Sequence, residues 1–253
     1  MMSVKPRRWW LLGVIGLLLA LAVSFSIYIG NRYAIADPAV KAFAKENKLS
    51  ILAYPKELLE LLQRNPEAKD FVLQYPLKKD LEVDIDLTEH LDRADMPLLL
   101  QWDQRWGYTQ YAGNVMGLTG CGPTCLSMVC IHLLDDASLT PKYVAQFATE
   151  NGYSLSGSGS SWTLISEGGV KLGLDVQEIP LVEKKIISNL QAGNPIICSV
   201  GPGFFTTTGH FIVLTGYADG SVTVNDPNSP EKSAKTWKLT EVMEQIRNLW
   251  VCK

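Results

Sequence analysis

GLTGCGPTCLSM, residues 117–128, places Cys121 between two glycines and directly before an apolar run. The glycines permit a sharp backbone turn, and Pro123 suits the first turn of a helix, where a missing N–H needs no partner. Apolar residues then recur at helical spacing to about Leu134. Cys121 is therefore expected at a helix N-terminus, where unpaired N–H groups and the positive end of the helix dipole favour a thiolate and can hold an oxyanion. A buried structural thiol fits the same stretch, and we expect that role for Cys125, one turn further on.

A nucleophilic cysteine needs a general base within reach, and the chain has three histidines. His90 lies in an acidic segment, and His132 lies inside the helix expected after Cys121. His210 follows a glycine-rich loop and opens the apolar run HFIVL, which predicts an imidazole at the rim of a sheet. His210 is therefore the candidate base.

Asp226 ends the strand expected in VTVNDP and is the candidate group that orients the His210 imidazole. A hairpin turn at residues 219–220 offsets the two side chains by about three positions, roughly 10 Å along an ideal strand. A bulge or a bend has to close this gap. An ordinary Asp-Pro turn is the alternative interpretation of Asp226.

The order of helical and extended patterns predicts the fold class. Short helices are expected within residues 37–79, and longer ones in residues 121–134, 140–150, 161–174, 184–192 and 239–250. Strands are expected at residues 80–90, 196–200, 210–218 and 221–226, with the last two forming the hairpin. Because helices come first and antiparallel strands later, the class is α+β.

The N-terminus carries an uncharged apolar run over residues 9–30, whose twenty-two residues would span roughly 33 Å as a helix, about the thickness of a bilayer core. Three basic residues precede it: Lys5, Arg7 and Arg8. This flank predicts a signal anchor over residues 1–33, with the N-terminus in the cytoplasm and the rest of the chain outside. The alternative is a signal peptide cleaved near Ala36, which would release a secreted chain. In both cases the body of the chain is exported.

The remaining chain divides into a small helical stalk or subdomain, residues 37–93, and a main domain, residues 94–253. A formal charge of −3 and a pI of about 5.7 argue against nucleic-acid binding. Five cysteines are too few, and odd in number, for a disulfide scaffold. We expect no cofactor and no metal, and the sequence leaves the oligomeric state open.

Three segments give a resemblance to a known family: LLLQWDQRWGYTQYAGNVMGLTGCGPTCLSMV, GHFIVLTGY and VNDP. Together they resemble the bacteriocin-processing, double-glycine-leader peptidase domains, within the papain-like cysteine peptidases. The resemblance covers residues from about 97 to 253. It implies a papain-like fold, in which a nucleophile helix precedes an antiparallel sheet, and a peptide or protein substrate.

The resemblance also implies roles for individual residues. Cys121 would be the nucleophile, His210 the base and Asp226 the orienting group. A glutamine upstream of the cysteine would help to hold the oxyanion. Gln101 is the candidate, with Gln104 and Asn114 as alternatives.

The sequence favours an exported, membrane-anchored bacterial cysteine peptidase that acts through a thioester acyl-enzyme. The same chemistry would serve an amidase or a transpeptidase. A non-catalytic peptide- or cell-wall-binding domain on the same scaffold is the alternative function, since a fold does not fix a function. A zinc site is disfavoured because the helix scatters its candidate ligands around its circumference: Cys121, Cys125, Cys130 and His132. Whether Cys121 pairs with Cys125 is left open.

Overall fold

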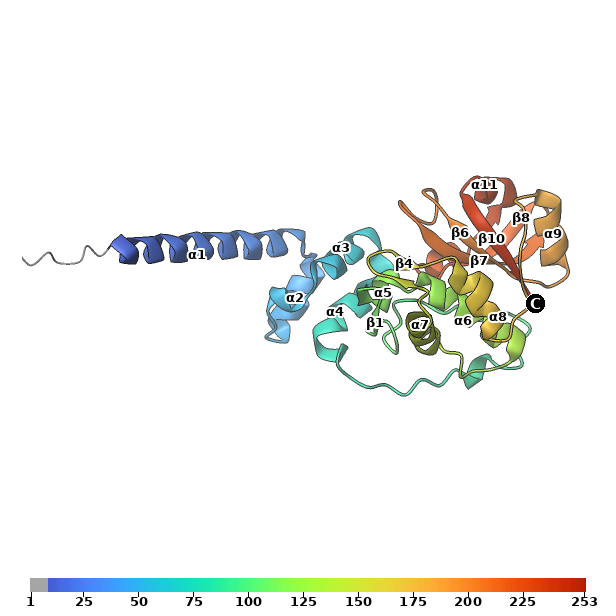
Figure 1. Ribbon diagram of the computed structural model, residues 1–253, viewed down its shortest axis with the longest axis horizontal. Coiled ribbons are helices and arrows are strands. Elements are labelled where there is room, and N and C mark those ends of the chain that lie inside the picture. Colours follow the sequence, from blue (N-terminus) through green and yellow to red (C-terminus); the bar gives the residue numbers. More distant parts are fainter. Residues whose placement is uncertain (1–8) are drawn as a thin grey trace, which may run out of the picture. The chain divides into compact units, whose positions relative to one another are not determined.

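The computed structural model describes residues 9–253, and the chain divides into two compact units at Pro66 (Figure 1). The first unit ends at Pro66, and the second unit is Glu67–Lys253. The expected stalk, residues 37–93, is thus divided between the two units. The physical reason lies in Phe71, which stacks on Tyr108 with ring centroids 4.5 Å apart and so packs with the main domain.

The described part of the first unit consists of helices and turns. Its elements are α1 (Trp9–Ile35), α2 (Pro38–Glu46), a 3₁₀ turn (Ile51–Ala53) and α3 (Lys56–Arg64). The Asp37 side chain accepts a hydrogen bond from the N–H of Ala39 and caps α2. After α3, a 3₁₀ turn (Pro66–Ala68) leads into α4, which begins at Lys69.

α1 has the composition of a membrane-spanning helix. Residues Trp10–Ile35 have a mean hydropathy of 2.4, and none of the most apolar window is buried inside the protein. The basic residues on which the predicted orientation depends lie outside the described residues: Lys5, Arg7 and Arg8.

The second unit joins helices to a six-stranded sheet. Its helices are α4 (Lys69–Lys78), α5 (Met116–Thr119), α6 (Cys121–Leu134), α7 (Pro141–Glu150), α8 (Gly169–Lys171), α9 (Glu183–Gln191), α10 (Pro230–Ser233) and α11 (Leu239–Met243). The main sheet consists of β5 (Val176–Glu178), β6 (Ile196–Val200), β7 (His210–Ala218), β8 (Ser221–Asn225), β9 (Thr236–Lys238) and β10 (Ile246–Cys252). Two small hairpins complete it: β1 (Gln110–Tyr111) with β2 (Asn114–Val115), and β3 (Ser154–Leu155) with β4 (Gly159–Ser160). The predicted α+β class is confirmed.

The main sheet is antiparallel, in the order β5-β10-β6-β7-β8-β9, and it is buried on both faces. Phe211 and Val213 of β7 pack with the cluster that contains α6 and α7, whereas Ile212 and Leu214 pack with the cluster that contains α9 and α11. Figure 1 shows the corresponding helices on either side of the sheet. Covered faces explain why β6 and β7 are continuous apolar runs rather than alternating ones.

The expected strand at residues 80–90 is wrong. Residues 81–87 form no regular structure and pair with no strand in the described part of the chain, and Thr88–His90 forms a 3₁₀ turn. Of the apolar side chains of the alternating pattern, Leu81 and Val83 are 60% and 41% exposed, whereas Ile85 is partly buried against the core and Leu87 is buried. Alternation predicts a strand only where a partner strand is available to accept its hydrogen bonds.

The expected closing helix at residues 239–250 is half right. α11 ends at Met243, and β10 begins at Ile246. β10 pairs with both β5 and β6, so its backbone groups are satisfied by two neighbours and its side chains enter both core clusters. This two-sided pairing outweighs the local helical pattern.

Candidate active site

Cys121 is the first residue of α6, as the sequence predicts, with Gly120 at the N-cap. Because Gly120 has no side chain, nothing from the cap occupies the first N–H groups of the helix. All five cysteines are free thiols, and Cys121 is the only one that is not fully buried. The thiol thus has both the local field and the access that a reactive cysteine needs.

Three groups that can donate hydrogen bonds adjoin the Cys121 thiol and lower its pKa: the His210 imidazole and the backbone N–H groups of Phe211 and Gly122. Burial raises the pKa of the thiol, but these donors and the positive charge of His210 outweigh burial and hold the pKa below its ordinary value. At Cys125, one turn along α6, burial acts without such donors and raises the pKa. Cys125 is therefore a core residue, as expected.

His210 lies at the start of β7, and its Nε2 is 2.7 Å from Oδ1 of Asp226. Burial lowers the pKa of the imidazole, but the Asp226 carboxylate and the Cys121 thiol outweigh burial and raise the pKa. With Nε2 bound to Asp226, the other ring nitrogen is the one left for Cys121. A lowered thiol pKa beside a raised imidazole pKa favours the thiolate–imidazolium pair over the neutral pair.

Asp226 is completely buried just beyond the end of β8. Its Oδ1 also accepts the N–H of Asn228 at 2.8 Å, and its own N–H donates to the Ser233 hydroxyl at 2.9 Å. These bonds fix the carboxylate relative to the loop after β8. The structure thus brings Cys121, His210 and Asp226 together, with the imidazole hydrogen-bonded to the carboxylate and beside the thiol.

Gln101 is buried, and its Nε2 donates to the carbonyl of Gly117 at 3.0 Å, one turn before Cys121. The side-chain amide of Gln101 carries two hydrogens, and this bond uses one of them, so one remains to donate. The two alternatives are engaged elsewhere: Gln104 accepts from Lys78, and the side chain of Asn114 accepts the N–H of Val115. Of the three candidates, Gln101 is the one whose side-chain amide donates to Gly117, four residues before Cys121.

Tyr111 and Ser160 also adjoin the nucleophile, and sequence reasoning missed both. Their hydroxyls are 2.7 Å apart, and a Cβ added at Gly122 would come within 2.5 Å of the Ser160 hydroxyl. The β3–β4 hairpin thus packs directly against the start of α6. The glycine after Cys121 signals a close approach, but the sequence does not say which segment approaches.

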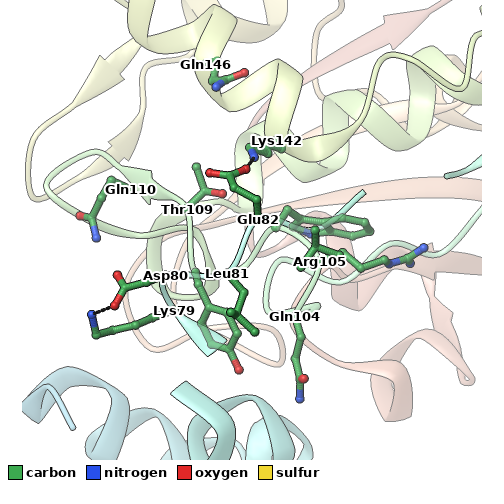
Figure 2. A pocket seen from close by; sticks show the side chains of 13 residues that line it. Lys79, Asp80, Leu81, Glu82, Gln104, Arg105, Thr109, Gln110, Lys142 and Gln146 are labelled. Carbon is green, nitrogen blue, oxygen red and sulfur yellow. Dashed lines mark hydrogen bonds and ion pairs between the residues drawn. The ribbon is translucent and has the colours of Figure 1, made fainter. Parts of the chain in front are cut away.

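A separate surface pocket of about 500 Å³ lies between residues 79–83, residues 104–110 and α7 (Figure 2). None of the four candidate site residues lines it. Four of its charged groups form pairs: Lys79 with Asp80, and Lys142 with Glu82 at 3.4 Å, as the dashed lines in Figure 2 show. A fifth, Arg105, pairs with Asp103 outside the pocket lining at 2.8 Å.

Among residues 9–253, no three histidine, cysteine, aspartate or glutamate side chains lie close enough together to hold a metal ion. His132 and Cys130 lie on α6, but Cys130 is buried among core residues.

A family model described as "Peptidase_C39 like family" matches residues 93–251. The peptidase domain of Streptococcus ComA, a bifunctional ABC transporter involved in quorum sensing, superposes with a TM-score of 0.42 at 20% identity; the match covers 53% of this chain and 89% of that one. A C39-like peptidase from Bacillus anthracis also has a TM-score of 0.42, at 12% identity, over 67% of this chain and 96% of that one. A search of curated proteins finds no match.

Proposed function

The chain belongs to the Peptidase_C39 like family, and we propose that it is a cysteine peptidase that uses Cys121, His210 and Asp226 as a catalytic triad. The papain-like resemblance and the family assignment agree. The observation that carries the proposal is the His210 imidazole, which is hydrogen-bonded to the buried Asp226 and lies beside the Cys121 thiol. A merely structural cysteine has no need of a raised imidazole pKa beside it.

In the proposed mechanism the Cys121 thiolate attacks the carbonyl carbon of a peptide bond. The negative charge that develops on the carbonyl oxygen is held by N–H groups at the start of α6 and by the free amide hydrogen of Gln101. The His210 imidazolium donates its proton to the leaving amine as the C–N bond breaks, which leaves a thioester on Cys121. Water, deprotonated by His210, then attacks the thioester and releases the acid and the thiolate.

Asp226 does not take the proton in this scheme. Its carboxylate accepts from Nε2 of His210, keeps the other ring nitrogen toward Cys121 and stabilises the imidazolium. The same steps with a different acceptor would give a transpeptidase, and with a different acyl donor an amidase.

The proposal includes an exported, membrane-anchored location. Support comes from α1, which is long and apolar enough to cross a bilayer and is not buried inside the protein. Its last turn carries Arg32, and Tyr28 lies one turn earlier with its ring under the guanidinium. A tyrosine and an arginine at one end of an apolar helix are typical of the membrane–water interface.

Alkylation of the full chain in detergent with limiting iodoacetamide, followed by peptide mass spectrometry across pH 4 to 9, tests the function. We expect Cys121 to react well below the pH of about 8.5 at which a free thiol ionises, and His210→Ala to slow the reaction. The other four cysteines provide internal controls, since they are buried. If Cys121 reacts only in the ordinary thiol range, the peptidase proposal fails and a binding domain on this scaffold becomes the better description.

A further inference from the structure

The position of the Asp226 carboxylate depends on the short loop that follows β8. This loop runs through residues 226–229 and leads into α10 (Pro230–Ser233). The Ser233 hydroxyl joins the two ends of this loop, because it accepts the N–H of Asp226 and donates to the carbonyl of Ser229 at 2.8 Å. Two contacts from the segment before α5 also hold it: the N–H of Gln101 donates to the carbonyl of Pro227, and the Trp102 indole donates to the carbonyl of Asn228.

A third anchor on this loop comes from Glu67. One carboxylate oxygen of Glu67 accepts the Ser229 hydroxyl, and the other accepts the N–H of Glu231 at 2.8 Å. Ser229 is buried, and its hydroxyl oxygen also accepts the N–H of Lys232, so it caps α10. Both oxygens of a single carboxylate are thus used to clamp the end of the Asp226 loop. Hydrogen bonds to an ionised acceptor are stronger than those between neutral groups, so a carboxylate holds the loop more firmly than a neutral side chain would.

Glu67 lies outside the region that matches the family model, residues 93–251, and it is the first residue of the second unit. We infer that Glu67 is a positioning residue for the catalytic centre, which acts on Asp226 through Ser229 and α10. The inference rests on the proposed function, because it assigns Glu67 to the geometry of the proposed triad. The segment that precedes the family domain therefore takes part in the active site rather than serving only as a connection.

The effect of Glu67 is expected to be partial and to act through the position of the Asp226 loop. Oδ1 of Asp226 is shared between His210 and the N–H of Asn228, so a displacement of the loop lengthens the bond to His210. Misplacement of a catalytic group by about 1 Å can cost on the order of 10²-fold in rate. Gln101 and Trp102 still hold the loop when the Glu67 side chain is removed. We therefore expect the reaction rate to fall by about tenfold rather than by about 10²-fold.

The test compares two alkylating reagents on the full chain in detergent. Iodoacetate is an anion and reacts fastest while His210 carries its proton, whereas iodoacetamide is neutral and reports on the thiolate alone. In Glu67→Ala, the iodoacetate rate at Cys121 near pH 8 should fall about tenfold, and the alkaline limb of its pH profile should move toward acid. The iodoacetamide rate above pH 9 should stay unchanged. Glu67→Gln keeps one acceptor oxygen and should lie between the wild type and Glu67→Ala.

Glu231→Ala is the matched control. It removes a carboxylate from the same end of α10, but that side chain pairs with Lys235 on the exposed surface, and its backbone N–H still donates to Glu67. We expect the profile of Glu231→Ala to match the wild type. A Glu67→Ala profile that coincides with that of Glu231→Ala overturns the inference while the proposed function stands.

Failure of the proposed function and failure of the inference about Glu67 give different results. If the wild-type Cys121 shows no reactivity at low pH, the proposed function fails and the inference fails with it. If Glu67→Ala does not fold, all five cysteines become reactive together, and Glu67→Gln then decides. A smaller shift of the alkaline limb in the same direction supports the inference, and a superimposable profile overturns it.

Discussion

Nε2 of His210 lies 2.7 Å from Oδ1 of Asp226, although the β7–β8 pairing extends only to Val213 and Asn225 and includes neither residue. Beside the turn, Gly216 pairs with Thr223, and that register would leave Asp226 three positions away from the partner of His210. A bulge at Thr215 shifts the register by one residue and so reduces this offset.

The charge of Asp226 should set the upper pH limit of the ion pair. In the wild type the raised pKa of His210 keeps the imidazolium present well above the ordinary value of about 6.5. Asp226→Asn retains an acceptor for Nε2 but removes the charge, so the pKa of His210 should fall by roughly 1–3 units. The alkaline limb of the iodoacetate profile at Cys121 should move toward acid by the same amount.

Asp219→Asn is the control for this substitution, because Asp219 is an exposed residue of the same hairpin turn and asparagine tolerates its positive φ of 47°. Its profile should match the wild type. An Asp226→Asn profile identical to that of Asp219→Asn would show that the buried carboxylate does not act on His210.

Local chemistry explains which parts of the site are predictable from the sequence. The helix start at Cys121 follows from flanking glycines and a proline, and the turn at Asp219-Gly220 is confirmed by positive φ at both residues. The bulge at Thr215 has no comparable signal, because it results from pairing with β8 and not from the residue itself. The offset between His210 and Asp226, and the need for a bulge or a bend to close it, are thus predictable from the sequence, whereas the position of the bulge is not.

The errors in the predicted fold have the same origin. Residues 80–90 alternate like a strand but find no partner among the described residues, whereas residues 246–250 have apolar spacing that suits a helix but become the strand between β5 and β6. Both outcomes depend on what the rest of the chain places beside the segment. Glu67 escaped notice for the same reason, since its partners lie more than 160 positions away.

Phe71 should be needed for the stability of the second unit. It is buried, it accepts the Tyr108 hydroxyl at its carbonyl at 2.9 Å, and a Cβ added at Gly117 would come within 2.4 Å of its ring. Phe71→Ala should therefore lower the free energy of unfolding by about 3–5 kcal/mol. Thermal unfolding in detergent, followed by near-UV circular dichroism, measures it.

Leu77 offers a control on the same helix, since it is 44% exposed. Leu77→Ala should change the stability by less than about 0.5 kcal/mol. Equal, small effects of the two substitutions would place α4 outside the main domain, and the boundary at residues 93–94 would then be the better division of the chain.

The close approach of Ser160 to Gly122 should make the start of α6 intolerant of a larger residue. A methyl group at Gly122 would overlap the Ser160 hydroxyl and Cβ, at 2.5 and 2.8 Å. Gly122→Ala should cost about 1–3 kcal/mol of stability and slow the alkylation of Cys121, because the first turn of the helix has to move. Ser160→Gly in the same chain should restore part of both losses. Additive effects of the two substitutions would contradict the contact.

The apolar helix should be retained as an anchor rather than cleaved near Ala36. α1 continues to Ile35, whose carbonyl accepts from Gln63 at 2.7 Å, and Arg32 donates to the carbonyl of Tyr54 at 3.0 Å. Ala36 itself is buried within the first unit. Cleavage after Ala36 would remove contacts that hold this unit together, and the small residues of the cleavage signal lie in or beside a helix.

Mass spectrometry of the chain from membranes, after carbonate extraction, should therefore find residues 9–35 attached to the protein. A soluble chain that begins at Asp37 would show that the run is a cleaved signal peptide.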